Sequence, residues 1–137
     1  MIVYIDMVAD LFHPGHIGLF MQVKGLYPGC DIFVGLMSDK EAREYKRPPI
    51  LSLLERTIML ESCRYVSKVL PAAPMPITRE FIEENGIDLV IHGDDISESS
   101  RNYWYGEAIK LNKYKEIPYT HGLSTTDIIN RIGHTDN

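Results

Sequence analysis

Short apolar segments alternate with helical segments along this chain, and that alternation restricts the fold more than any other feature of the sequence. Strands that alternate with helices form parallel sheets joined by right-handed crossovers. We therefore predict an α/β fold built on five parallel strands. The expected strands are residues 3–5, 31–36, 65–70, 88–92 and 117–119, and the expected helices are residues 17–24, 53–62, 78–85 and 126–132.

Local signals support several of these boundaries. Ser52 begins a capping box at the start of the second helix. Thr78 is expected to cap the third helix, and Gly86 to end it. Residues 88–92 are almost wholly apolar, which is typical of a strand inside a parallel sheet. Residues 38–49 are polar, and we expect them to form a loop.

Length and composition bound the function. The chain has 137 residues, 45% of them hydrophobic, and we expect one domain at residues 1–132 followed by a flexible tail at 133–137. A net charge of −5 disfavours sequence-independent nucleic-acid binding, which needs a basic surface. Two cysteines give no disulfide framework, so we expect a reduced, cytoplasmic setting. We expect no signal peptide and no membrane anchor.

The segment His13-Pro14-Gly15-His16 lies between the first expected strand and the first expected helix. The start of a helix offers unpaired N–H groups and a positive dipole end, which together bind phosphate. Two imidazoles at this position can donate hydrogen bonds to a phosphoryl group. A metal site or a plain polar turn is the alternative, although the other three histidines are scattered and a metal site usually needs a third ligand.

A second candidate phosphate site is the segment Ser124-Thr125-Thr126, which follows Gly122 and begins the last expected helix. Three hydroxyl groups and free N–H groups at a helix start can hold phosphate oxygens. The alternative is that one of these hydroxyls only caps the helix.

Several charged residues are candidates for contacts with an anionic substrate. Lys46 and Arg47 lie in the expected loop and can neutralise charge on a triphosphate, although such residues are more often solvated. Arg56 on the following helix can reach inward or lie on the surface. Asp10 can orient a ligand or satisfy backbone donors in its turn.

The candidate residues follow different strands, so we expect them at one edge of the sheet, where ligands bind in such folds. His92-Gly93-Asp94-Asp95 follows the fourth expected strand and can contact a ribose hydroxyl, an exocyclic amine or a cationic head group, or form a plain turn. The triplet at 103–105 offers an aromatic surface or core packing. No nucleophile–base pair stands out, which favours direct phosphoryl or nucleotidyl transfer.

These motifs resemble the nucleotidyltransferase superfamily marked by His-x-Gly-His. Within it they resemble the cytidylyltransferases that make CDP-alcohols, such as the choline-phosphate, ethanolamine-phosphate and glycerol-3-phosphate cytidylyltransferases. The resemblance covers nearly the whole chain and rests on residues 3–6, 10–16, 38–39, 46, 55–56, 63–66, 92–96 and 122–129.

The resemblance implies a Rossmann-like five-stranded parallel sheet with helices on both faces, and a homodimer with contacts at residues 64–66. It implies that a phosphomonoester attacks the α-phosphate of CTP, with Mg²⁺, and that pyrophosphate leaves. His13 and His16 would stabilise the phosphate charge, and Lys46 would bridge the two substrates. The implied nucleotide-binding residues are Val8, Ala9, Asp10, His13, His16, Gly93, Asp94, Thr120, Gly122, Ser124, Thr125 and Thr126, and the implied substrate-binding residues are Asp10, Lys46, Arg56, Asp94 and Tyr119.

Three departures from the family pattern affect these expectations. Met7, Val8 and Ala9 precede Asp10 in place of the family's Gly-x-Phe/Tyr, which changes the shape of the loop. Tyr119 replaces an arginine that stabilises the transition state, so another cation must compensate or activity is low. Met75 and the segment near Glu98 replace aromatic residues of the choline cage, which disfavours choline.

The sequence thus predicts an enzyme that transfers CMP from CTP to a small phosphorylated alcohol or a phosphonate. The alternatives are an adenylyltransferase that uses ATP and a non-catalytic nucleotide-binding module. A flavodoxin-like redox module is the weakest alternative, because no set of electron-transfer residues is present.

Overall fold

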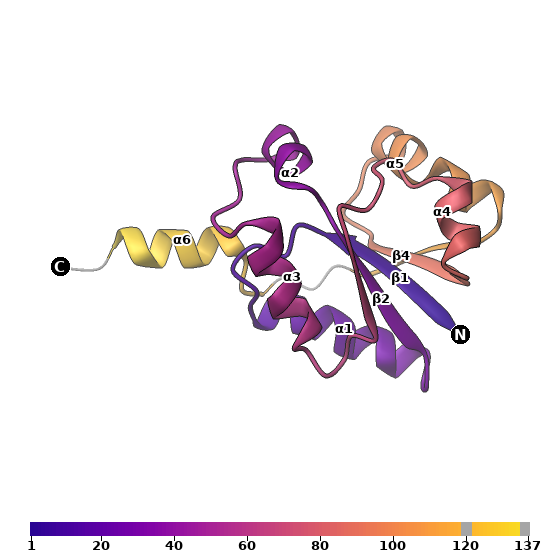
Figure 1. The fold of residues 1–137 in the computed structure, drawn as a ribbon, viewed down its shortest axis with the longest axis horizontal. Coiled ribbons are helices and arrows are strands. Elements are labelled where there is room, and N and C mark those ends of the chain that lie inside the picture. Colours follow the sequence, from indigo (N-terminus) through magenta and orange to yellow (C-terminus); the bar gives the residue numbers. More distant parts are fainter. Residues whose placement is uncertain (119–121, 135–137) are drawn as a thin grey trace.

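The computed structural model describes residues 1–118 and 122–134, which form one five-stranded sheet with helices around it (Figure 1). The strand order is β3-β2-β1-β4-β5, and every neighbouring pair is parallel, as predicted. The strands are β1 (Ile2–Met7), β2 (Asp31–Leu36), β3 (Lys68–Pro71), β4 (Leu89–Gly93) and β5 (Tyr114–Ile117).

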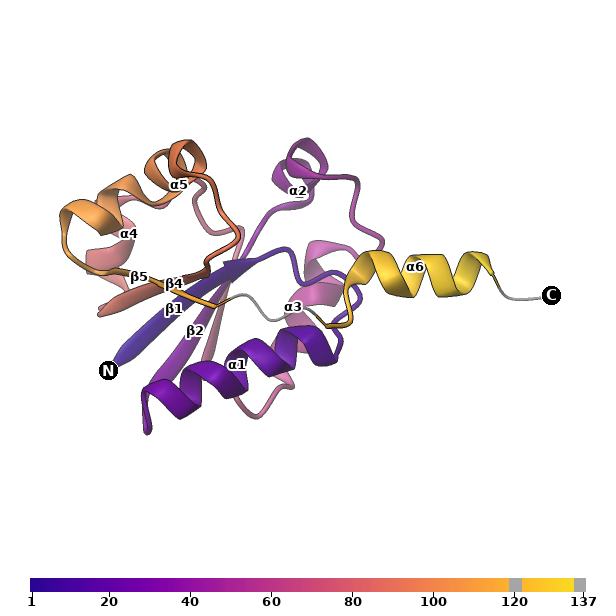
Figure 2. The same cartoon turned by 180° about the vertical axis from the view of Figure 1, so that it is seen from behind.

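Helices cover both faces of the sheet, which confirms the predicted layers (Figures 1 and 2). Helices α1 and α3 lie on one face, and α4 and α5 lie on the other. Helix α2 stands apart from the α4–α5 layer in both views, and α6 projects away from the rest. The helices are α1 (Pro14–Leu26), α2 (Asp39–Tyr45), α3 (Leu53–Glu61), α4 (Arg79–Glu84), α5 (Glu98–Lys110) and α6 (Thr125–Gly133).

Alternation along β1 builds a hydrophobic core on each face. Val3 and Ile5 belong to the core that includes Phe20 of α1, whereas Tyr4 belongs to the core that includes Ile82 of α4. Because both faces are covered, a strand of this sheet needs apolar residues at successive positions. This requirement explains the apolar run that predicted β4, which lies between β1 and β5.

Most predicted boundaries are confirmed by the caps. Ser52 and Glu55 form the predicted capping box of α3, and Thr78 accepts a hydrogen bond from the N–H of Phe81 at the start of α4. Gly86 has a φ of +63° just after α4, where a glycine is favoured. The last strand ends at Ile117 instead of beginning there.

Two helices were not predicted. Helix α2 lies within the stretch expected to be a loop, where Ser38 caps it by accepting from the N–H of Glu41. Helix α5 buries only Tyr105 and Ala108, so it lacks the apolar periodicity that identifies a helix in the sequence.

The C-terminal predictions were met in part. Helix α6 continues to Gly133, one residue into the expected tail. Residues 119–121 and 135–137, including the predicted site residues Tyr119 and Thr120, lie outside the described residues. No helix in the described part of the chain has both the length and the apolar character needed to cross a membrane.

Replacement of Gly35 tests the packing of β2 against β1. A Cβ at this position would come within 1.8 Å of the Tyr4 hydroxyl, whose side chain is fully buried. We expect Gly35→Ala to lower the free energy of unfolding by about 1–3 kcal/mol, because an overpacked core must shift. Chemical denaturation measures this change.

Gly25→Ala is the matched control, since Gly25 is an exposed position of α1 where an added Cβ would meet nothing within 4 Å beyond its own helix. We expect this change to stabilise the protein by up to about 1 kcal/mol, because alanine favours the helix. Equal stability of the two variants would contradict the packing argument.

Candidate functional site

A cleft of about 860 Å³ lies at the carboxyl edge of the sheet. Its volume is in the upper range of small-molecule sites, which suits two substrates side by side. The predicted site residues that line it are Val8, Ala9, Asp10, His13, His16, Lys46, Gly93, Gly122, Ser124, Thr125 and Thr126.

The two histidines form the N-terminal cap of α1. The Nδ1 atom of His13 accepts from the N–H of Gly15 at 3.0 Å, and Nδ1 of His16 accepts from the N–H of His13 at 3.2 Å. An imidazole nitrogen that accepts a hydrogen bond carries no proton, so the proton of each neutral ring is on Nε2. The cap therefore fixes both rings as Nε2–H donors.

Electrostatics also favour the neutral form of both rings. Burial lowers the pKa of His13, and the carboxylate of Asp127 opposes that shift. Burial lowers the pKa of His16 to about 4, with further lowering from the positive charges of His13 and Lys46 and opposition from Asp10. At neutral pH the pair therefore donates hydrogen bonds without carrying charge.

The start of α6 meets the start of α1. The Thr125 hydroxyl donates to the carbonyl of Asp10 at 3.0 Å, and its oxygen lies 3.3 Å from Nε2 of His13. Gly15 allows this approach, because a Cβ there would lie 2.3 Å from the carbonyl oxygen of Leu123. Ser124 caps α6 by accepting from the N–H of Asp127.

The contact between Thr125 and His13 is not a nucleophile–base pair. His13 already holds its proton on Nε2, because Nδ1 accepts from Gly15. The proton of the Thr125 hydroxyl is directed to the carbonyl of Asp10. Neither group can activate the other, so the arrangement suits direct transfer between two bound substrates.

Asp10 holds the segment after α2 in place. Its carboxylate accepts from the N–H groups of Ile50 at 2.8 Å and Leu51 at 2.9 Å, and from the guanidinium of Arg47 at 3.1 Å. Burial alone would raise the pKa of Asp10, but these hydrogen bonds and the charge of Arg47 outweigh it and lower that pKa. The carboxylate thus serves backbone donors of a distant segment, and not those of its own turn as the sequence-based alternative had it.

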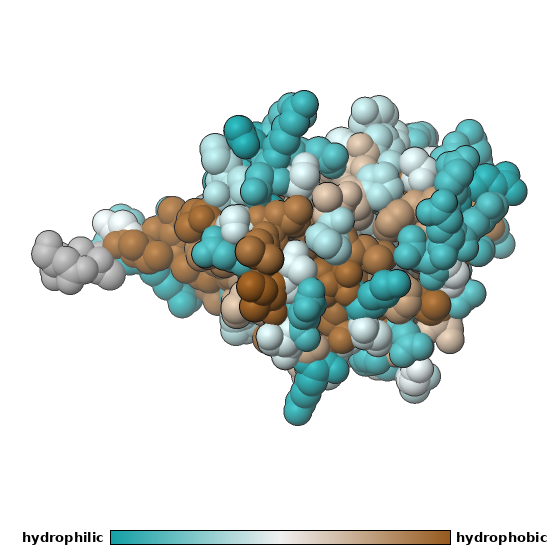
Figure 3. Space-filling view, in the orientation of Figure 1, coloured by the Kyte–Doolittle hydropathy of each residue, from teal (hydrophilic) through white to brown (hydrophobic). Residues whose placement is uncertain are grey.

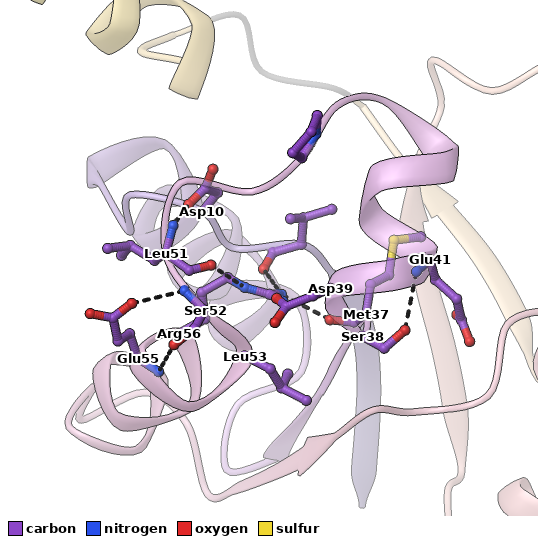
Figure 4. Close-up of polar contacts among 12 residues, drawn as sticks. Asp10, Met37, Ser38, Asp39, Glu41, Leu51, Ser52, Leu53, Glu55 and Arg56 are labelled. Atoms are coloured by element: carbon purple, nitrogen blue, oxygen red, sulfur yellow. Dashed lines mark hydrogen bonds and ion pairs between the residues drawn. The ribbon is translucent and has the colours of Figure 1, made fainter.

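Arg56 does not line the cleft. Figure 4 shows its side chain between the start of α3 and the segment that leads into α2. Its side chain is fully buried. Its guanidinium donates to the carbonyls of Val8, Met37 and Leu51 and to the carboxylate of Asp39, at 2.7–3.2 Å. Arg56 was predicted to bind substrate, but it instead holds neighbouring segments together by hydrogen bonds and does not line the cleft.

The turn that Arg56 supports is strained. Ala9 and Leu11 have φ values of +57° and +49°, which residues other than glycine rarely adopt. Strain of this kind persists where the surroundings fix the backbone, and it is common at binding sites. Here the backbone is fixed by the hydrogen bond from Arg56 to the Val8 carbonyl. It is also fixed by the hydrogen bonds that the Asp10 carboxylate accepts from Ile50 and Leu51.

The far end of the cleft contains residues that the sequence analysis did not assign. Asp6 lines it, and one carboxylate oxygen accepts from the Tyr105 hydroxyl at 2.8 Å. The other oxygen, Oδ2, is buried without a partner among the described residues, and burial raises the pKa of Asp6. The signal in the sequence was a charged residue within an apolar strand. Tyr45, Met75 and Trp104 also line the cleft.

Asp94 was predicted to bind ligand, but it does not line the cleft, whereas Asp95 and His92 do. Of the aromatic triplet, Trp104 and the nearly buried Tyr105 both line the cleft, and Tyr103 is exposed. Within residues 1–118 and 122–134, no three His, Cys, Asp or Glu side chains gather as they would around a metal ion.

Comparison with known proteins identifies the family. The family described as cytidylyltransferase-like matches residues 8–131, which include the turn before α1 and most of α6. The chain belongs to this family. Both segments that carry the two candidate phosphate sites thus fall within the family match.

Curated members of the family are similar over nearly the whole chain. The probable ethanolamine-phosphate cytidylyltransferase of Schizosaccharomyces pombe is 35% identical over 130 residues, which is 94% of this chain and 35% of that protein. Choline-phosphate cytidylyltransferase A of Homo sapiens is 39% identical over 132 residues, which is 95% of this chain and 36% of that protein. The chain thus spans about a third of the length of these relatives.

A solved structure shares the fold. The lipopolysaccharide core biosynthesis protein from Thermoplasma volcanium GSS1 superimposes with a TM-score of 0.64 over 90% of this chain and 98% of that chain. The identity is 20%, so this likeness concerns the fold alone.

The low pKa of His16 gives a pH-dependent stability that can be measured. The folded pKa of about 4 lies below the unfolded value of 6.5, so the unfolded chain binds the proton more readily between these values. We expect the free energy of unfolding to fall as the pH falls from about 6.5 to about 4. Denaturation at a series of pH values measures this, and His16→Asn should weaken the dependence.

Proton NMR titration provides the direct measurement. His16 should titrate well below its ordinary pKa, and Lys46→Ala should raise that pKa, because the charge of Lys46 contributes to the lowering. An ordinary pKa for His16 in the folded protein would contradict the burial and tautomer assigned to this ring.

Proposed function

We propose that this chain transfers CMP from CTP to a small phosphorylated alcohol or a phosphonate, and that it releases pyrophosphate. The observation that carries the proposal is the meeting of two helix starts and two neutral imidazole donors at one end of a cleft. The names of the relatives, ethanolamine-phosphate and choline-phosphate cytidylyltransferases, support CTP over ATP.

In the proposed reaction, an oxygen of the acceptor phosphate attacks the α-phosphorus of CTP, and the bond to pyrophosphate breaks. His13 and His16 donate Nε2–H hydrogen bonds to phosphate oxygens whose charge changes during transfer. The N–H groups and hydroxyls at the start of α6 hold the β- and γ-phosphates. The backbone at Val8 and Ala9 contributes to the nucleotide site, and Gly93 allows close approach of the nucleoside.

Lys46 is proposed to bridge the two substrates. Its ammonium has no carboxylate partner in the described part of the chain, so its charge is available to phosphate. We propose that Mg²⁺ enters as the MgCTP substrate, because Mg²⁺ is commonly held through substrate phosphates and few protein ligands. This fits a cleft in which Asp10 is already committed to Arg47 and backbone N–H groups.

The far end of the cleft is proposed to hold the head group of the acceptor. Burial disfavours the ionised form of Asp6, and a positively charged head group would offset that cost and supply the partner that Oδ2 lacks, whereas a neutral polyol would not offset it. We therefore propose an amino-alcohol phosphate or an aminophosphonate as the acceptor.

Turnover tests the proposal. We expect pyrophosphate release with MgCTP, in preference to ATP, GTP and UTP, and with phosphoethanolamine, phosphocholine or 2-aminoethylphosphonate in preference to glycerol-3-phosphate or ribitol-5-phosphate. His16→Ala should reduce turnover by about 10²- to 10³-fold, since it removes one donor to the developing charge. Absence of pyrophosphate release with every nucleotide and acceptor would reject the proposed activity.

Two variants test whether His16 acts as a hydrogen-bond donor to phosphate or only as part of the cap of α1. In His16→Asn the amide oxygen can still accept from the N–H of His13, so the fold should be kept while turnover is not restored. His134→Ala removes a histidine that ends α6 on an exposed surface, and its turnover should equal that of the parent protein.

We also propose a homodimer in a reduced, cytoplasmic setting. Both cysteines are free thiols. Apolar side chains gather on the surface over α3 and α6 (Figure 3), where Leu54, Ile58 and Ile132 are each more than half exposed. Such patches commonly mark interaction sites.

Sedimentation equilibrium tests the dimer. We expect twice the mass of the chain for the parent protein, and the monomer mass for Ile58→Asp, because burying a carboxylate in an apolar contact is costly. Gly25→Ala, on the exposed surface of α1, should leave the mass unchanged. A monomeric parent protein at micromolar concentration would reject the dimer.

A further inference from the structure

Helix α2 carries Lys46 at its C-terminal end, yet α2 itself is weakly held. It has seven residues, and only Ala42 is buried. Its N-terminal end is fixed through Ser38 and through Asp39, which pairs with Arg56 at 2.7 Å (Figure 4). Its C-terminal end reaches the cleft, where Tyr45, Lys46 and Arg47 all form part of the lining.

Two contacts hold that end from opposite sides. On one side Arg47 pairs with Asp10 at 3.1 Å. On the other side the ring of Tyr45 meets the ring of Trp104 edge to face, with centroids 6.1 Å apart and planes at 86°. Lys46 lies between these contacts, and its ammonium sits 5.5 Å from the centroid of the Tyr45 ring.

Trp104 lies on α5, which is well anchored to the rest of the protein. Its neighbours along the helix, Tyr105 and Ala108, are buried against the sheet, and the Trp104 carbonyl accepts from the N–H of Ile77 at 3.1 Å. The contact therefore joins a weakly held helix to a well-anchored one across the cleft.

We propose that Trp104 is a positioning residue for the transfer reaction: through its contact with Tyr45 it holds the ammonium of Lys46 over the cleft. The inference rests on the proposed function, in which Lys46 bridges the phosphates of the two substrates. The ring of Tyr45 is the surface on which Lys46 rests, so a shift of that ring moves the charge. A displacement of about 1 Å at a reacting centre can cost about 10²-fold in rate.

A double-mutant cycle tests the proposal. We expect Trp104→Ala to reduce kcat/KM by about tenfold or more in the parent protein, but to cause no further loss in a Lys46→Ala background, since it acts through Lys46. Trp104→Phe keeps an aromatic edge and should restore most of the activity. Losses that simply multiply in the double variant would overturn the proposal.

NMR titration of His16 tests the position of the charge without any turnover. Since Lys46 lowers the pKa of His16, Trp104→Ala should raise that pKa in the same direction as Lys46→Ala. Ile109→Ala is the control, because Ile109 is on the same helix and outside the cleft lining. If Lys46→Ala raises the pKa and Trp104→Ala does not, the positioning role is wrong.

The two measurements separate the inference from the function on which it rests. An inactive parent protein whose His16 pKa responds to both Lys46→Ala and Trp104→Ala would reject the proposed transfer and retain the positioning contact. An active parent protein in which the losses from Trp104→Ala and Lys46→Ala multiply would support the proposed transfer and reject the positioning role of Trp104.

Discussion

The buried guanidinium of Arg56 is the interaction on which the site depends. It reaches the carbonyls at the ends of β1 and β2, the carbonyl of Leu51 before α3 and the carboxylate that begins α2. Guanidinium is suited to this task, because its five donors lie in a fixed plane and it stays charged when buried. One side chain thus sets the relative positions of three of the segments that enclose the cleft.

The histidine pair meets a structural and a chemical requirement with the two nitrogens of each ring. In an ordinary capping box a hydroxyl and a carboxylate accept the free N–H groups of the helix start. Here Nδ1 of each imidazole accepts instead, which leaves Nε2–H as the donor of each ring. In a cap made from serine and glutamate, the carboxylate would satisfy a backbone N–H but could not donate to a phosphate, and only the serine hydroxyl would keep a proton.

The sequence was most informative where local rules decide the structure. Apolar runs predicted β1 to β4 but misplaced β5, and capping residues such as Ser52 and Thr78 predicted helix starts, because both signals depend on neighbours in the chain. The convergence of His13, Gly93 and Thr125 also followed, since parallel strands place their carboxyl ends at one edge.

What the sequence did not provide depends on distant partners. Arg56 has the pattern of an ordinary helix residue, and only the fold shows that carbonyls from three other segments surround it. Asp10 is equally ambiguous until its acceptor atoms are matched with the N–H groups of Ile50 and Leu51. Helix α5 escaped detection because the aromatic residues at 103–105 divide among the surface, the cleft and the core.

The place of Trp104 has a practical consequence. It is the one tryptophan in the chain, and its indole forms part of the cleft wall. The emission of an indole depends on the polarity and the charges around it, so the intrinsic fluorescence of this protein arises beside the site where ligands are proposed to bind. The chain thus carries its own optical probe, with no label to attach and no second indole to obscure the signal.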